Sequence, residues 1–212
     1  MKAKEVFSRI GSAFFGAMRP RYEERIPYAI RGDVFFKMED VRTGDVQRWE
    51  KRNLIVKDAS ILVARLIKDN QEPSKGAFVL AVGTGDVGWN PLSPPAPTNT
   101  QRALYSELTR KTFSATTFID ADGVPTSIPT NVVDFTTTFT ESEAVGPLVE
   151  MGLIGGNIST NLSVRNPVTP PNGSYSALVD LTTRETLINY LTFNVISKPA
   201  TSTLEITWRL TF

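Results

Sequence analysis

The chain has 212 residues, with 23 basic and 22 acidic side chains and neither cysteine nor histidine. The absence of cysteine excludes disulfides and cysteine-based metal sites, and the absence of histidine removes the usual general base and the commonest transition-metal ligand. A formal net charge of +1 and the lack of a long uncharged apolar stretch predict neither nucleic-acid binding nor a membrane span.

The first 28 residues predict an amphipathic helical arm. Its apolar side chains recur at helical spacing: Phe7, Ile10, Phe14, Phe15 and Met18. Glu5 and Arg9 interrupt the apolar run and no cleavage site follows, so we expect the segment to belong to the mature protein and not to a signal peptide. The arm has three open interpretations: a helix packed on its own domain, an anchor in a neighbouring subunit, or a helix on a membrane surface.

Residues 29–212 predict a mainly β domain, of β-sandwich or jelly-roll type, with one packed helix. A hairpin is expected around the turn at residues 42–44, because a glycine lies there between two strand-like segments. A helix is expected next, with Asp58 in its first turn and the apolar stripe Ala59, Leu62, Val63, Leu66 and Ile67. Further strands are predicted over residues 103–119, 133–140, 191–196 and 204–212.

A possible cofactor motif occurs at residues 83–88, which match G-x-G-x-x-G after an apolar run. A dinucleotide-binding turn must open a helix, because the pyrophosphate binds the free N–H groups of that helix. Here four prolines within residues 91–97 forbid a helix. We therefore expect a loop at the end of a strand and no cofactor, and Trp89 in this loop is a candidate partner-binding residue.

The acid pair Glu141 and Glu143 is the remaining enzymatic candidate, because two carboxylates in a cleft hydrolyse glycosides. The pair follows a strand in the polar segment TESEA, which favours a solvated turn. The sequence thus predicts a non-enzymatic protein with no catalytic residue and no metal site. A host-surface carbohydrate-binding module that uses Trp89 stays open as an alternative function.

Several short segments follow one another in a particular order from residue 53 onward. They are NLIVKDASILVARLI, AVGTGD, TQRALYSELTRKTF, DFTTTFTESEA, GPLVEMGLI and SKPATSTLEITWRLTF. This order resembles that of structural proteins of tailed-bacteriophage virions. The matching residues are Leu104, Glu107 and Arg110; Leu148, Glu150, Gly152 and Leu153; and Leu204, Ile206 and Trp208. The resemblance implies a collar, tail-fibre, baseplate or head-decoration protein located in the virion. It also implies that the chain contacts other virion proteins and forms a homo-oligomer in a symmetric assembly.

Four of the matching residues are expected to have structural roles: Glu107, Arg110, Glu150 and Trp208. Glu107 and Arg110 are three positions apart, so in a straight strand they face opposite sides of the sheet. They cannot pair directly there without a bulge, and we expect each to meet a partner on another strand. Glu150 lies between two apolar residues, so we expect it to be partly buried and to need a counter-charge or backbone donors.

Overall fold

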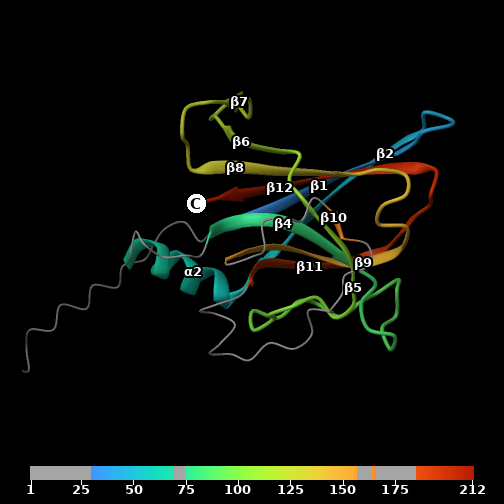
Figure 1. Ribbon diagram of the computed structural model, residues 1–212, viewed down its shortest axis with the longest axis horizontal. Helices are drawn as coiled ribbons and strands as arrows, with labels where there is room; N and C mark the ends of the chain where they lie inside the picture. Colours follow the sequence, from blue (N-terminus) through green and yellow to red (C-terminus); the bar gives the residue numbers. More distant parts are fainter. Residues whose placement is uncertain (1–29, 69–74, 157–163, 166–184) are drawn as a thin grey trace, which may run out of the picture.

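The computed structural model describes residues 30–68, 75–156, 164–165 and 185–212. These residues form two antiparallel sheets of six strands each and one helix (Figure 1). The predicted mainly β fold with one internal helix is therefore confirmed, whereas the arm with Phe7, Ile10, Phe14, Phe15 and Met18 lies outside the described residues.

The first sheet has the strand order β2-β1-β12-β8-β6-β7. Its strands are β1 (Arg31–Asp40), β2 (Val46–Arg52), β6 (Ala115–Ile119), β7 (Pro125–Thr126), β8 (Val132–Phe139) and β12 (Ser202–Thr211). The predicted hairpin joins β1 to β2 through Gly44, whose φ of 75° lies in the left-handed region that glycine tolerates. The predicted alternation is present in β12, where Leu204, Ile206, Trp208 and Leu210 are buried and the residues between them are half-buried.

The second sheet has the strand order β10-β5-β4-β9-β11-β3. Its strands are β3 (Leu54–Ile55), β4 (Lys75–Gly83), β5 (Glu107–Thr112), β9 (Gly146–Gly156), β10 (Val164–Arg165) and β11 (Glu185–Lys198). Residues 103–106, which were predicted to belong to a strand, form a loop instead. The reason is that the N–H groups of Tyr105 and Ser106 donate to the carboxylate of Glu150 and not to a neighbouring strand.

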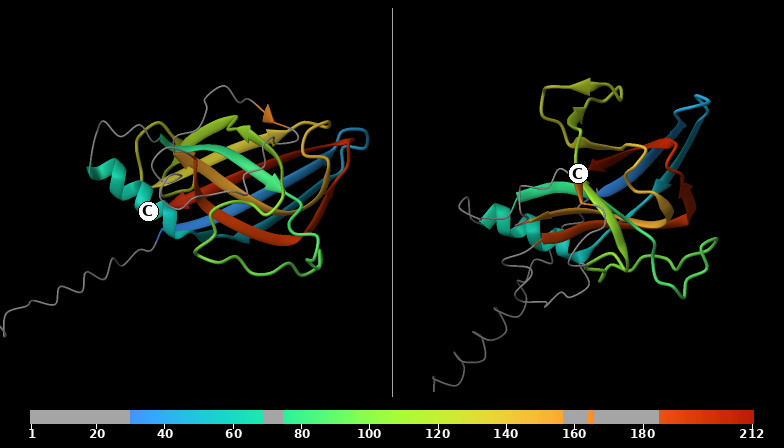
Figure 2. Two further views of the ribbon diagram at one scale, coloured as in Figure 1. Left: turned by 60° about the horizontal axis from the view of Figure 1, so that its bottom comes forward. Right: turned by 45° about the vertical axis from the view of Figure 1, so that its right-hand side comes forward.

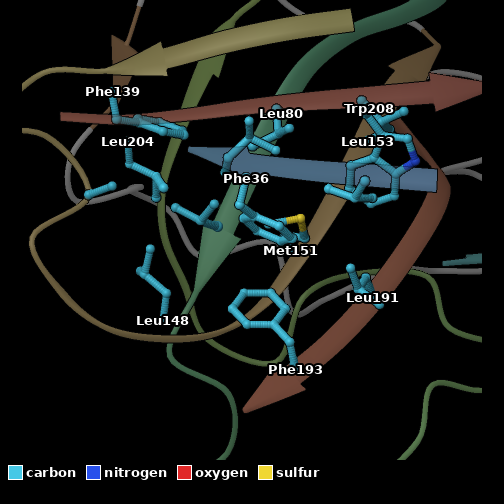
Figure 3. Packing of buried hydrophobic residues seen from close by; sticks show 14 of the residues in the cluster. Phe36, Leu80, Phe139, Leu148, Met151, Leu153, Leu191, Phe193, Leu204 and Trp208 are labelled. Carbon is cyan, nitrogen blue, oxygen red and sulfur yellow. The ribbon is translucent and has the colours of Figure 1, made fainter. Parts of the chain in front are cut away.

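The two sheets share one hydrophobic core, to which both contribute inward-facing side chains (Figure 3). Phe36 of β1 illustrates the packing, because its ring stacks on Trp49 of β2 at 5.2 Å between centroids and meets Phe193 of β11 edge-on at 5.5 Å. The first contact lies within one sheet and the second joins the two sheets. Trp49 is therefore partly buried and packs against this core.

The predicted helix is α2 (Lys57–Lys68), with Asp58 in its first turn. Ala59 and Leu62 belong to the shared core, whereas Val63 and Leu66 are 38% and 40% exposed. The helix lies at one end of the two sheets, on the same side as the C-terminus (Figures 1 and 2). Part of the apolar stripe of the helix therefore packs in the core, and part of it remains exposed to solvent.

A second, smaller core lies on the other face of the second sheet. It consists of residues of the sheet, of Val56 between β3 and α2, and of Leu104, which belongs to the long loop between β4 and β5 (residues 84–106). The sheet residues are Val79, Ala81, Ile154, Leu187 and Tyr190. Strand β9 is therefore covered on both faces, and every residue from Leu148 to its end at Gly156 is buried. The loop that carries the glycine and proline motifs is part of the folded structure.

Candidate functional site

One buried carboxylate fastens both ends of the loop at residues 84–106. Glu150 has no exposed surface, and its Oε1 accepts hydrogen bonds from the N–H groups of Gly85 at 3.1 Å and Ser106 at 2.8 Å. Its Oε2 accepts from the N–H of Tyr105 at 3.0 Å and the hydroxyl of Tyr190 at 2.6 Å. Four neutral donors thus replace the water that the charge loses on burial. Glu150 is more deeply buried than the sequence suggested, and its donors come mainly from the backbone.

Tyr190 is the partner of Glu150 that the sequence did not reveal. Burial raises the pKa of Tyr190, and the adjacent carboxylate of Glu150 raises it further, so the phenol stays protonated and remains a donor. The two residues lie on the paired strands β9 and β11 and are brought together only by the sheet register. No local spacing in the sequence could have indicated this contact.

The middle of the loop is attached to β11. The carbonyl oxygens of Pro91 and Pro95 accept hydrogen bonds from the N–H of Val195 at 2.8 Å and the hydroxyl of Thr192 at 2.7 Å. Long loops without secondary structure are uncommon in compact folds, and ordered ones are usually functional. The prolines that exclude a dinucleotide-binding helix therefore belong to a loop that is fixed along its length.

Trp89 is half-buried within this loop. Its ring meets that of Tyr105 edge-on at 4.7 Å between centroids, and a Cβ atom added to Gly85 would lie 2.5 Å from it. Trp89 therefore supports the loop from inside, and the apolar side chains on its outer surface are Val87, which is fully exposed, and Leu92, which is 70% exposed. Tyr105, which is 56% exposed, is the third exposed large hydrophobic residue of the loop, and we call Val87, Leu92 and Tyr105 together the loop patch. These three residues are the candidate partner-binding residues of the loop.

Replacing Gly85 by alanine is expected to destabilise the protein by roughly 2–3 kcal/mol. Gly85 has a φ of 68°, and an added Cβ would also lie 2.7 Å from Val149. Gly44→Ala is the matched control, because Gly44 has a φ of 75° but no atom within 4 Å of an added Cβ. The loss of unfolding free energy in Gly44→Ala therefore measures the backbone strain alone, which is about 1 kcal/mol. Urea unfolding measures both, and equal losses would show that Trp89 does not constrain Gly85.

Glu107 and Arg110 form a buried ion pair, contrary to the expectation for a straight strand. Both side chains are 1% exposed, and the guanidinium binds the carboxylate through Nε to Oε1 and through Nη2 to Oε2 at 2.7 Å. They can meet because β5 is not straight: Val82 pairs with Thr109 but Gly83 pairs with Glu107, so Leu108 is an extra residue. Such a β-bulge changes the alternation and brings residues three apart to one side.

Trp208 lies in the other sheet, with no exposed surface. Its ring N–H donates to the side-chain oxygen of Asn189 at 3.1 Å, in the amide orientation in which that oxygen also accepts from Asn53. A buried indole needs such an acceptor. Trp208 therefore joins β12 of the first sheet to β11 of the second.

The acid pair Glu141 and Glu143 lies in the turn between β8 and β9, where its groups contact lysine side chains. Glu143 binds Lys111 through Oε2 at 2.6 Å and also accepts from the N–H of Thr140 at 2.8 Å. Burial acts to raise its pKa, but the bonds from Lys111 and Thr140 outweigh it and hold the pKa below its usual value. The ammonium of the buried Lys198 donates to the carbonyl of Glu141 at 3.2 Å, so these charges hold the β8–β9 turn.

Glu143→Gln is expected to cost about 1 kcal/mol at pH 7, because it weakens the bond to Lys111. A carboxyl whose pKa is lowered by folding contributes stability above its unfolded pKa and loses it as the pH falls through the folded pKa. The stability of the wild type should therefore approach that of the variant below the ordinary pKa of glutamate, about 4.3. Urea unfolding from pH 7 to pH 3 tests this. A difference that is constant with pH would contradict the ionic role of Glu143.

The described part of the chain contains no group of three or more acidic side chains that could hold a metal ion. Within the same residues, no helix is long and apolar enough to cross a membrane. Comparison with protein-family models and with curated protein sequences gave no match. The function is therefore inferred from the geometry of the sites.

The structure brings together three of the residues that the sequence singled out. Gly83 of β4 pairs with Glu107 on one side and with Glu150 on the other, so the ion pair and the loop carboxylate flank the same residue. Trp208 lies apart from them, in the first sheet. The sequence indicated this loop as a contact surface through Trp89, but it did not single out the residues of the loop patch. One signal for two of them was available, because Val87 and Leu92 are isolated apolar residues in a glycine- and proline-rich segment.

Proposed function

We propose that the protein is a non-enzymatic structural component of a tailed-phage virion, in the collar, neck, tail or head decoration. It assembles through protein–protein contacts of its β-sandwich and through its N-terminal arm. The observation that carries this proposal is the fixed loop: Glu150 and β11 hold it in place while Val87 and Leu92 point outward. A preformed apolar surface binds another protein with little loss of conformational entropy.

The residues that match the phage pattern support a structural role. Glu107, Arg110, Glu150 and Trp208 are all buried and bonded within the fold. Charged side chains in a catalytic site need access to a substrate. The three charged side chains of this set are instead buried, and they bond to groups of the sheets and the loop. The pattern therefore describes how such a domain is built, and the surfaces that assemble the particle lie elsewhere on the molecule.

The arm is the second assembly element of the proposal. In a helix, the stripe at Phe7, Ile10, Phe14 and Met18, with Phe15 beside it, offers an apolar face to an adjacent subunit. Its burial contributes about 25 cal/mol for each Å² of apolar surface removed from water. The copies of the chain would then occupy equivalent positions in a symmetric particle.

Deletion of residues 1–21 tests the proposal in particles. We expect a truncated protein that folds, with unchanged urea unfolding, but is absent from purified virions. Phe14→Asp should reduce incorporation about tenfold, since burying one such side chain contributes about 2 kcal/mol and tenfold corresponds to about 1.4 kcal/mol. Ser12→Asp is the control, because Ser12 lies off the stripe. Normal incorporation of the truncated protein would contradict the proposal.

A carbohydrate-binding module is the alternative, because Tyr105 is 56% exposed beside Trp89. An exposed aromatic ring can stack on a sugar. A glycan array probed with the full chain distinguishes the two functions. Binding that is lost in Tyr105→Ala but kept in Leu92→Ala favours the alternative, whereas the phage proposal predicts no glycan binding by either variant or by the wild type.

A further inference from the structure

A second apolar site lies at the end of the sheets where α2 and the C-terminus meet. It is a pocket of about 230 Å³, and all of its lining residues are apolar or glycine. Val63 and Leu66 of α2 form one wall, Phe135 of β8 and the terminal Phe212 form another, and Ala77 of β4 also lines it. Apolar cavities of this kind take hydrocarbon groups in preference to water, as a cavity of roughly 150 Å³ takes benzene.

The rim of this pocket is exposed. Val63 is 38%, Leu66 40% and Phe212 49% exposed, although the helical stripe and the strand alternation predict a buried position for all three. Three large apolar side chains around an apolar pocket form a continuous surface that favours contact with another apolar group. The sequence therefore encodes more apolar surface at this end than the described residues cover.

The N-terminal segment ends at the same place. Ile30, the first described residue, lines the pocket, so the 29 residues before it end at this pocket. The apolar stripe of the arm is separated from Ile30 by residues 19–29, which include two prolines and five charged side chains. Proline disfavours the helical conformation of the residue before it, and such a linker spans up to roughly 36 Å when extended. The stripe is therefore suited to reach a neighbouring molecule.

We propose that this pocket receives the apolar stripe of the arm from a second copy of the chain. The inference rests on the proposed function and identifies the receiving surface. A pocket of 230 Å³ holds one or two side chains such as Phe14 and Met18, and the remaining stripe residues cover Val63 and Leu66. Each copy would offer an arm and a pocket, so a chain of such contacts closes into a ring when the rotation between copies allows it.

Disulfide trapping tests this arrangement directly, because the chain contains no cysteine. Two full-length variants, Phe14→Cys and Val63→Cys, are mixed and oxidised, and one of them carries a size tag that identifies the mixed dimer on a non-reducing gel. We expect a mixed dimer in preference to either symmetric dimer. The control mixture pairs Phe14→Cys with Asp122→Cys, since Asp122 is exposed in the β6–β7 turn. This control should yield roughly tenfold less mixed dimer.

Other occupants of the pocket give different results. If the pocket takes the arm of its own chain, a variant with both cysteines closes an internal disulfide in dilute solution and the mixture of single variants yields no mixed dimer. If an unrelated partner occupies it, neither disulfide forms above the control level. Either result overturns the inference.

A pocket-filling variant tests the docking of the arm in this pocket independently of the proposed virion function. Ala77→Leu places three more carbon atoms in the pocket, so we expect a melting temperature equal to or above that of the wild type but a mixed dimer yield reduced about tenfold. If Ala77→Leu enters virions normally while the protein lacking residues 1–21 does not, the arm docks elsewhere: the inference is overturned and the proposed function stands. If the truncated protein enters virions normally, the proposed function itself fails.

Discussion

Glu150→Ala is expected to lower the free energy of unfolding by roughly 3–5 kcal/mol. The substitution removes the acceptor of three backbone N–H groups, those of Gly85, Tyr105 and Ser106, and of the Tyr190 hydroxyl. A buried donor left without a partner costs about 1–3 kcal/mol, and the losses are not additive because water can enter the space. Urea unfolding of the full chain gives the value, and a loss of less than about 1 kcal/mol would show that Glu150 does not hold the loop.

Two further variants show how much of the loss in Glu150→Ala comes from the Tyr190 hydroxyl and how much from the backbone donors. Tyr190→Phe removes one donor and keeps the carboxylate, so we expect a cost of about 1–2 kcal/mol. Glu150→Gln keeps the shape of the side chain but turns an N–H₂ group toward backbone donors. Its loss of unfolding free energy should therefore lie between the losses of Tyr190→Phe and Glu150→Ala. Because Glu150 closes both ends of the loop, Glu150→Ala should also increase proteolysis within residues 84–106 under native conditions. Tyr190→Phe should leave that cleavage rate nearly unchanged.

Arg110→Met is expected to cost about 3–5 kcal/mol, because it leaves the buried carboxylate of Glu107 without its guanidinium. Replacing both residues, as Glu107→Leu with Arg110→Met, should be much less costly than either single change, since the desolvation of both charges disappears together. Urea unfolding of the two single variants and the double variant gives the coupling energy. Additive losses would contradict a direct pair.

The pair of Arg209 and Asp134 provides the matched control. It has a similar bidentate geometry, at 2.7 and 2.8 Å, but Arg209 is 28% exposed and Asp134 13% exposed. Solvent screens such a pair, so Asp134→Ala should cost only about 0.5–1 kcal/mol. Equal losses at the two sites would show that burial does not determine the contribution of the Glu107–Arg110 pair.

The sequence by itself determined the secondary structure wherever a periodic pattern was long. Alternation over residues 204–210 gave β12, the glycine at position 44 gave the first hairpin, and helical spacing after Asp58 gave α2. The prolines after Trp89 also excluded a cofactor-binding helix without any structural information. These signals are local, because the period of the side chains and the backbone limits of glycine and proline act within a few residues.

Only the tertiary structure decided which charged residues meet. The bulge at Leu108 turns Glu107 toward Arg110, the register of β9 with β11 places Tyr190 beside Glu150, and neither feature has a local sequence signal. The same holds for the pocket at the end of the sheets, where α2 and Phe212 come together from distant parts of the chain. Strand register and sheet order are set by the packing of the whole core, so contacts between distant segments become visible only when that packing is known.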